Sequence, residues 1–287
     1  MNCLPRLTRL GMIKFGVVLT RPVARQEGLI DALTQHGVSV LSLPALSIEP
    51  LAPIHQAPLQ PQAMPYDLIV FVSRAAVEYF PEGIYEHHTQ AILASVGSRT
   101  YQAIKNRFVD APTVLCPAEG SNQDSEALWA VLQPELSKIK RVLIVRAQNG
   151  RDWLHDQFIA KGCQVDYLAV YARRPLAWSA SQLDSLISHI ETQTPLVWLF
   201  TSLQAFESIE LAFKKSGVEP SAAIQAFVVT HPKLIEPVRG LLATSYKNIL
   251  GSSHGALAHP LAYPNVPYSI AEPNDASILA TVLKAFK

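Results

Sequence analysis

Leu68-Ile-Val-Phe-Val-Ser73-Arg-Ala-Ala76-Val-Glu78 has a second copy in this chain, Val197-Trp-Leu-Phe-Thr-Ser202-Leu-Gln-Ala205-Phe-Glu207. Phenylalanine, serine, alanine and glutamate recur in register at a constant offset of 129 residues. In each copy an apolar run typical of a buried strand passes directly into residues that favour a helix. The repeat therefore indicates two halves built on one architecture.

The same alternation of strand and helix patterns extends along the whole chain. Residues 15–20 predict a strand, 24–36 a helix that Gly37 ends, and 39–43 a second strand. This rhythm is typical of parallel βαβ units. We therefore predict an α/β protein made of two similar domains with parallel sheets.

A weaker internal similarity pairs residues 124–132 with residues 275–283. Asp124 or Ser125 is suited to cap the first of these helices. The offset here differs from that of the stronger repeat, which we attribute to an insertion at 252–273 that contains Pro, His and Tyr.

The two copies do not follow one another simply along the chain. The opening βαβ segment is too short to form a core alone, so we expect it to pack on the C-terminal half. Residues 38–51 and 165–175 read as extended connections between domains. We predict a discontinuous domain of residues 13–48 plus 173–287, a second domain of 51–170, and a disordered tail at 1–12.

Composition excludes several classes of protein. The 287 residues are 49% hydrophobic and 16% charged, which predicts a globular chain, and a formal net charge of +1 gives no electrostatic argument for nucleic acid. No apolar run is long enough to cross a membrane, and we expect no secretory signal. Three cysteines without metal-ligand spacing predict neither disulfides nor zinc, so we expect a cytoplasmic protein without a metal.

Candidate binding residues lie in the turns that follow predicted strands, where ligands bind in parallel α/β sheets. These turns are rich in hydroxyl groups and arginine, and the helix N-termini beside them present free N–H groups to carboxylates or phosphates. A serine here is also a common helix cap, and an arginine can be a solvated surface charge, so both interpretations stay open. The candidates are Thr20, Arg21, Ser73, Gly97, Ser98, Thr100, Arg146, Arg151 and Ser202.

Tyr171 is the candidate acid. It lies in an apolar run within one predicted inter-domain connection, where it is either a half-buried sheet aromatic or a functional group. A phenol with an ordinary pKa of about 10 stays protonated at neutral pH and can donate a proton to a leaving oxygen. Dinucleotide, P-loop and nucleophile-elbow motifs do not occur, and the adjacent His87 and His88 are more typical of a loop than of a metal site.

An ordered set of motifs resembles the uroporphyrinogen-III synthase family over about residues 15–215. The motifs are Val18-Leu-Thr-Arg-Pro22, Leu43-Pro-Ala-Leu-Ser-Ile-Glu-Pro50, Tyr66-Asp-Leu-Ile-Val-Phe-Val-Ser73, Ser95-Val-Gly97-Ser-Arg-Thr100, Val142-Leu-Ile-Val-Arg146 to Gly150-Arg151, and Val170-Tyr171. The resemblance implies two α/β domains joined by a two-stranded antiparallel ladder, a cleft between them that binds hydroxymethylbilane, and no cofactor or metal. It also implies a hydro-lyase that closes the linear tetrapyrrole, inverts ring D and releases water.

By that resemblance Tyr171 matches a tyrosine that assists departure of the ring A hydroxyl, while Ser73, Thr100 and Ser202 match hydroxyls that face the substrate. Nothing in the sequence demands more than a monomer, and we expect the substrate to be handed over from hydroxymethylbilane synthase. The turn at residues 230–234 departs from the family, which usually has a Gly-Pro turn followed by small or hydroxyl residues, whereas this chain has Thr230-His231-Pro232-Lys233-Leu234. Two alternatives remain: a two-lobed protein that binds small anions without catalysis, and an inactive synthase paralogue.

Overall fold

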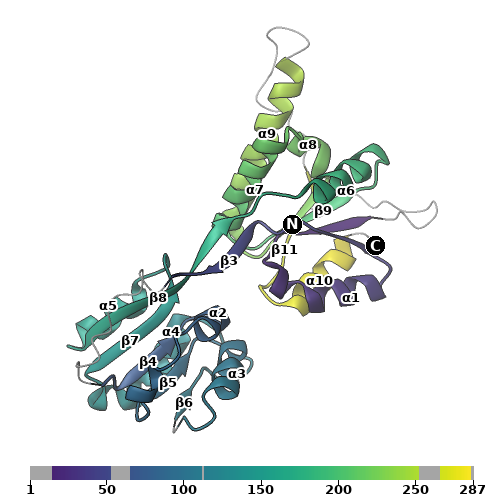
Figure 1. Ribbon diagram of the computed structural model, residues 1–287. Helices are drawn as coiled ribbons and strands as arrows, with labels where there is room; N and C mark the ends of the chain where they lie inside the picture. Colours follow the sequence, from purple (N-terminus) through teal and green to yellow (C-terminus); the bar gives the residue numbers. More distant parts are fainter. Residues whose placement is uncertain (1–14, 53–64, 112, 252–265, 286–287) are drawn as a thin grey trace. The chain divides into compact units, whose positions relative to one another are not determined.

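The computed structural model describes residues 15–52, 65–111, 113–251 and 266–285, which fall into two compact units (Figure 1). The terminal unit is Met1–Ser47 with Pro175–Lys287, and the central unit is Ile48–Arg174. Each contains one sheet with helices packed on it, as the alternating sequence pattern predicts. The tail expected at residues 1–12 lies outside the described residues.

The terminal unit is built on a parallel sheet with the strand order β11-β10-β9-β1-β2. Its strands are β1 (Gly16–Leu19), β2 (Ser39–Ser42), β9 (Leu196–Phe200), β10 (Ala226–Val229) and β11 (Tyr268–Ile270). Its helices are α1 (Glu27–Gln35), α6 (Ala180–Glu191), α7 (Leu203–Ser216), α8 (Pro220–Ala223), α9 (Ile235–Gly251) and α10 (Asp275–Ala285), with single 3-10 turns at Val23–Arg25 and Pro232–Leu234.

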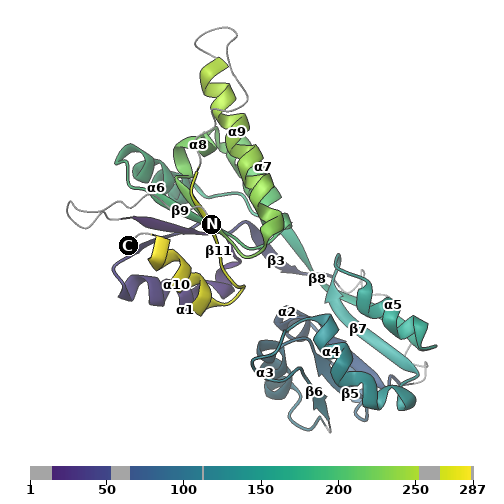
Figure 2. The same cartoon turned by 180° about the vertical axis from the view of Figure 1, so that it is seen from behind.

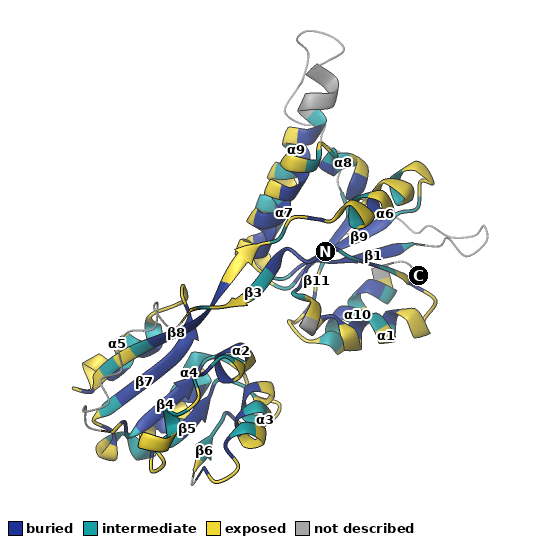
Figure 3. Ribbon diagram, in the orientation of Figure 1, coloured by how far each residue is buried: buried dark blue, intermediate teal, exposed yellow. Residues whose placement is uncertain are grey.

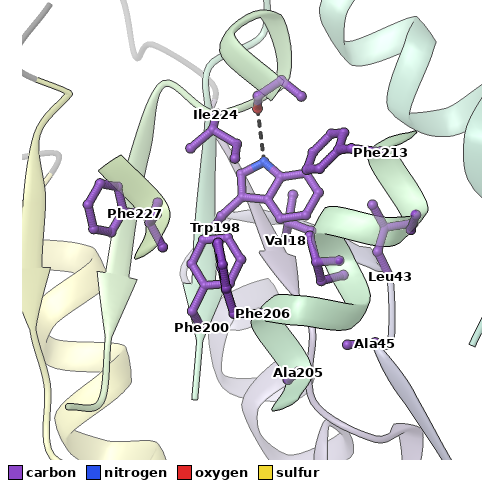
Figure 4. Packing of buried hydrophobic residues seen from close by; sticks show 14 of the residues in the cluster. Val18, Leu43, Ala45, Trp198, Phe200, Ala205, Phe206, Phe213, Ile224 and Phe227 are labelled. Carbon is purple, nitrogen blue, oxygen red and sulfur yellow. Dashed lines mark hydrogen bonds between the residues drawn. The ribbon is translucent and has the colours of Figure 1, made fainter. Parts of the chain in front are cut away.

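Side chains of successive strand residues point to opposite faces of this sheet, so the unit has two cores. Trp198 and Phe200 of β9 pack on the face that carries α7 and α9, whereas Val197 and Leu199 pack on the face that carries α1 and α10 (Figures 1 and 2). Trp198 is fully buried, and its indole N–H donates to the Ala223 carbonyl at 2.9 Å (Figure 4). That bond satisfies the one polar atom that burial of the indole would otherwise leave unpaired.

The first helix begins later than the sequence pattern predicts. Residues 24–36 were expected to form one helix, but Val23–Arg25 form a 3-10 turn and α1 starts at Glu27. The side chain of Gln26 is fully buried at this junction and donates to the Leu19 carbonyl at 3.3 Å. The predicted end is confirmed, because Gly37 has the positive φ of 73° that stops a helix at low cost.

The central unit contains the sheet β3-β8-β7-β4-β5-β6. Its strands are β3 (Leu46–Pro50), β4 (Leu68–Phe71), β5 (Ile92–Ser95), β6 (Val114–Leu115), β7 (Arg141–Ala147) and β8 (Gln164–Pro175), and β3 and β8 run across the unit boundaries. Its helices are α2 (Arg74–Glu78), α3 (Ser98–Arg107), α4 (Ser125–Leu132) and α5 (Trp153–Ala160), with 3-10 turns at Tyr85–His87 and Gln133–Lys138.

The central sheet is also covered on both faces. Phe71 packs with Phe80 and Phe108 on the face that carries α2 and α3, while Leu68 and Val70 face α4 and α5. Figure 3 shows buried strands between helices whose outer sides are exposed. Near-continuous apolar strands are what a parallel sheet with two covered faces requires.

Strands β3 and β8 are the two places where the chain passes from one unit to the other. The N–H of Leu176 donates to the Ala45 carbonyl at 2.9 Å, and the N–H of Leu51 donates to the Val170 carbonyl at 3.0 Å. Higher residue numbers in one strand therefore pair with lower residue numbers in the other, so β3 and β8 run antiparallel, in contrast to the parallel pairs of the central sheet.

The two units have the same spatial strand order but a different chain order. The repeat aligns β4 with β9. In this alignment β5 and β6 correspond to β10 and β11, and β7 and β8 correspond to β1 and β2. The units are thus circular permutations of one architecture. The repeat itself is confirmed, because Ser73 caps α2 by accepting from the Ala76 N–H, and Ser202 caps α7 by accepting from the Ala205 N–H.

The helix cap expected from the weaker repeat and the bounds of the insertion differ from the prediction. Asp124 caps α4 as predicted, but the cap of α10 is Asn274, which accepts from the Ser277 N–H at 2.8 Å. Asp275 is instead the first helical residue. Residues 268–270, assigned to the insertion, form β11 beside β10 because Tyr268 stacks on the buried ring of Phe227. Residues 252–265 of that insertion lie outside the described residues.

Candidate active site

The neighbouring strands β4 and β7 mark the point in the central sheet where the chain reverses its direction of winding. From β4 the chain continues to β5 and β6 on one side, and from β7 it continues to β8 on the other. In open α/β sheets the ends of such strands leave a crevice that binds ligands. A cavity of about 310 Å³ lies here, and its polar lining comes from Ser125, Arg146, Asn149, Arg151, His155, Tyr167, Tyr171 and Arg173.

Ser73 and Tyr171 meet at this crevice. The Ser73 Oγ and the Tyr171 hydroxyl oxygen are 2.9 Å apart, while the same Oγ accepts the Ala76 N–H at 3.1 Å. Tyr171 is 1% exposed, so its ring is held firmly by the core. Ser73 is therefore both a helix cap and a partner of the predicted acid, and the two interpretations of this serine are compatible.

Arg146 is buried beside the cavity and held on three sides. It is 8% exposed, its Nη1 donates to Asp152 Oδ1 at 2.7 Å, and its guanidinium lies 4.5 Å from the ring centre of Tyr167. A Cβ on Gly150 would lie 2.7 Å from Nη2 of Arg146, so the absence of a side chain at Gly150 leaves room for the arginine. This arginine is pre-organised, in contrast to a solvated surface charge.

Asp152 joins Arg146 to Tyr167. The Tyr167 hydroxyl donates to Asp152 Oδ1 at 2.9 Å. The hydrogen bond from Arg146, followed by that from Tyr167, lowers the pKa of Asp152 below its ordinary value. Burial, followed by the bond to Asp152, raises the pKa of Tyr167 to about 12. At neutral pH this cluster therefore holds an ionised carboxylate, a neutral phenol and a guanidinium.

Arg151 is exposed and forms an ion pair with Glu126 of the first turn of α4. The hydrogen bond from Arg151 lowers the pKa of Glu126 below its ordinary value. Arg151 lines the cavity, as does Arg146, so the structure brings both predicted arginines of the central unit to one place.

Gly97, Ser98 and Thr100 lie at the start of α3, and none of them lines that cavity. Gly97 is the cap residue, and the Ser98 N–H donates to Gln123 Oε1 at 2.6 Å. Thr100 is 6% exposed. The side chain of Gln123 therefore already accepts from the Ser98 N–H, one of the groups predicted from the sequence to bind a ligand.

Thr20, Arg21 and Ser202 belong to the terminal unit. The Thr20 hydroxyl is fully buried and donates to the Leu199 carbonyl at 2.6 Å, which favours a structural role. Arg21 is 7% exposed and its Nη1 donates to Asp275 Oδ1 at 2.8 Å, while its buried Nε and Nη2 contact no acceptor among the described residues. Ser202 is exposed at the start of α7.

Sequence reasoning missed Arg173, Asp152 and Tyr167. Arg173 Nη2 donates to the Tyr171 hydroxyl oxygen at 3.4 Å. Arg173 follows Tyr171 by two residues in β8, and this strand spacing was the available signal. At the divergent turn, His231 Nδ1 accepts the Lys233 N–H at 3.1 Å, so the imidazole caps the 3-10 turn Pro232–Leu234.

A larger groove of about 570 Å³ lies between α7, α8 and α9 of the terminal unit. Its lining is mainly apolar, and its Lys214 and Glu210 neutralise each other at 2.8 Å. Its lining therefore offers a single cation to an anionic ligand, whereas three arginines line the smaller cavity of the central unit. Within the described residues, no helix is long and apolar enough to span a membrane, and no three His, Cys, Asp or Glu side chains are grouped as metal ligands.

Comparison with known proteins agrees with the motifs. The model of the family described as uroporphyrinogen-III synthase HemD matches residues 27–232. Uroporphyrinogen-III synthase of Escherichia coli (strain K12) is 26% identical over 174 residues, which is 58% of this chain and 68% of that protein.

Two solved structures are also similar. A mutant uroporphyrinogen III synthase of the extremely thermophilic bacterium Thermus thermophilus is 14% identical, with coverage of 83% of this chain and 100% of that one and a TM-score of 0.48. Uroporphyrinogen-III synthetase of Helicobacter pylori 26695 is 13% identical, with coverage of 94% and 98% and a TM-score of 0.49. Because the family match extends over more than half of the sequence, the chain belongs to the uroporphyrinogen-III synthase family, lyases of tetrapyrrole biosynthesis.

Proposed function

We propose that the chain converts hydroxymethylbilane to uroporphyrinogen III and that the cavity at the ends of β4 and β7 holds the reacting end of the substrate. The observation that carries this proposal is the contact between Ser73 and Tyr171 at a cavity lined by Arg146, Arg151 and Arg173. A linear tetrapyrrole carries acetate and propionate carboxylates, and guanidinium groups bind carboxylates through paired hydrogen bonds.

In this proposal Tyr171 is the acid and Ser73 orients its hydroxyl. The phenol donates its proton to the hydroxyl on ring A, the carbon–oxygen bond breaks, and water leaves. The ring nitrogen lone pair forms the new double bond of the azafulvene. The substituted carbon of ring D is the nucleophile and attacks the electrophilic carbon of ring A, and fragmentation with reclosure then inverts ring D. Orientation contributes most of the rate advantage, because the reacting atoms must meet at one particular carbon.

The remaining predicted residues divide according to what their polar atoms already bind. We assign substrate carboxylates to Arg146 and Arg151, and we assign another to Arg21, whose buried Nε and Nη2 contact no described acceptor. Ser202 is exposed and keeps a substrate role. Gly97, Ser98 and Thr100 shape the start of α3, while Thr20 acts through its bond to Leu199.

Three finer features belong to the same proposal. The chain works as a monomer in the cytoplasm, requires no cofactor, and receives hydroxymethylbilane from the synthase that makes it. Sedimentation of the purified protein at assay concentration tests the monomer, and a dimer at nanomolar concentration contradicts it.

The test of function is the isomer of the product. The full chain is mixed with hydroxymethylbilane generated in situ, and the oxidised porphyrins are separated by chromatography. We expect the type III isomer. A product that contains only type I, the isomer formed by unassisted closure, would contradict the proposed enzymatic activity. The two alternatives, a binding protein and an inactive paralogue, would then remain.

A further inference from the structure

We propose that Arg173 is a positioning residue that stabilises the phenolate formed when Tyr171 releases its proton. This inference rests on the proposed function, since it requires Tyr171 to be the acid. Arg173 was not among the candidates from the sequence, and its assignment comes from its contact with the tyrosine oxygen.

The geometry of β8 brings the two side chains together. Tyr171 and Arg173 are two residues apart in an extended strand, so both side chains lie on the same face. Arg173 Nη2 lies 3.4 Å from the Tyr171 hydroxyl oxygen, and its guanidinium carbon lies 5.8 Å from the ring centre. This is a long hydrogen bond, and it shortens when the oxygen gains negative charge.

The direction of this bond determines where the tyrosine proton points. A guanidinium has donors and no acceptor, so the Tyr171 oxygen accepts from Arg173. The hydrogen of the phenol is then free to point to Ser73 Oγ at 2.9 Å or to a substrate hydroxyl. Arg173 thus holds the proton on the side where the reaction needs it.

The other arginines around the cavity are already paired with carboxylates. Arg146 binds Asp152, and Arg151 binds Glu126. Among the described residues that line the cavity, Arg173 is the arginine that contacts no carboxylate. Its charge is therefore available to the phenolate. The other titratable side chains that line the cavity are His155 and Tyr167.

The proton balance closes over one turnover. The Tyr171 proton is transferred to the ring A hydroxyl, which departs as water with the electron pair of the carbon–oxygen bond. Tyr171 is then a phenolate beside Arg173. Ring closure forms a carbon–carbon bond and releases one proton from the substrate. That proton returns to the phenolate, so neither an oxidant nor a reductant is needed.

The experiment compares Arg173→Gln and Arg173→Lys in the full chain, each with and without Tyr171→Phe. Formation of type III isomer is measured against substrate concentration. The matched control is Arg174→Gln, which removes the neighbouring exposed arginine of β8 from the opposite face of the strand. Thermal unfolding verifies that every variant is folded.

We expect Arg173→Gln to lower kcat about tenfold with little change in KM, a size typical of a lost bond to a charged group. Arg173→Lys should recover part of the rate. In the Tyr171→Phe background, Arg173→Gln should cause no further loss.

Several results would overturn this inference. An unchanged kcat in Arg173→Gln, an equal loss in the Tyr171→Phe background, or a change confined to KM would each show that Arg173 does not act through Tyr171. Unchanged turnover in Tyr171→Phe alone would do the same. These outcomes differ from failure of the proposed function, in which the wild-type chain itself yields only the type I isomer.

Discussion

Arg21 and Arg146 occupy equivalent positions in the two sheets. Leu19 pairs with Leu199 across β1 and β9, and Ile144 pairs with Val70 across β7 and β4. Because Leu199 and Val70 correspond in the repeat, Leu19 corresponds to Ile144, and each arginine lies two residues further along. Both arginines are buried and each donates Nη1 to an aspartate, Asp275 for Arg21 and Asp152 for Arg146. The duplicated fold thus presents one constrained arginine at the same strand end in each unit.

Replacing either arginine should weaken substrate binding more than it slows chemistry. Arg21→Gln and Arg146→Gln each remove a carboxylate-binding cation, so we expect KM to rise about tenfold while kcat falls less. Steady-state kinetics with hydroxymethylbilane measure this. Arg74→Gln is the control because Arg74 is exposed and pairs only with Glu78 on the surface of α2. Equal KM values in all three variants would contradict the assignment.

Tyr171→Phe should lower turnover about tenfold or more, because a general acid usually contributes about 10²- to 10⁴-fold to the rate. The phenylalanine ring retains the packing of a side chain that is 1% exposed and loses only the hydroxyl at Ser73. Tyr66→Phe is a matched control. Tyr66 is also buried, and its hydroxyl donates to Asp166 at 2.9 Å outside the cavity lining. If both variants retain wild-type turnover, Tyr171 is a packing residue.

The two serine caps offer a comparison within one chain. Ser73→Ala and Ser202→Ala each remove a hydroxyl that accepts a helix N–H, so each should lower the free energy of unfolding by about 1 kcal/mol. Ser73 also contacts Tyr171, so we expect kcat to fall in Ser73→Ala, whereas Ser202→Ala should act on KM. Urea unfolding and steady-state kinetics test both parts. A similar loss of kcat in both variants would count against the role of Ser73 as the partner of the acid.

Acidification should destabilise the central unit through His88. Burial, followed by the nearby charges of His87 and Arg141, lowers the pKa of His88, and its Nδ1 accepts the Tyr66 N–H at 3.2 Å. A pKa lower in the folded state means that its contribution to stability is complete above the unfolded value of about 6.5 and is lost as pH falls towards the folded value.

The measurement is the free energy of unfolding in urea between about pH 8 and pH 5. Wild type should lose more stability on acidification than His88→Gln, whose side chain can still accept the Tyr66 N–H. His36→Gln is the control because His36 is exposed and lies in the terminal unit. Parallel curves for wild type and His88→Gln would rule out this contribution.

Local patterns predicted the parts of the fold that depend on neighbours in sequence. The strands around Phe71 and Phe200, the caps Ser73 and Ser202 and the helix stop at Gly37 all follow from side-chain chemistry and backbone freedom within a few residues. Strand β11 was missed because three residues provide too little periodicity to be distinguished from a loop.

The site was predicted less completely, for a physical reason. The sequence placed Ser73, Arg146 and Arg151 at strand ends, where ligands bind in parallel α/β sheets. It could not show that Gln123 occupies the Ser98 N–H or that Leu199 takes the Thr20 hydroxyl, because these partners are remote in sequence. Hydrogen bonds of that kind depend on which strands lie side by side.

By itself, the sequence determined the α/β class, the duplication and the family, because these depend on periodicity, on local caps and on the order of short motifs. Only the tertiary structure decided that the copies are circularly permuted, that Arg21 corresponds to Arg146, and that Arg173 reaches the Tyr171 oxygen. Strand register and contacts between distant side chains come from packing the whole sheet, and no local stretch of residues specifies them.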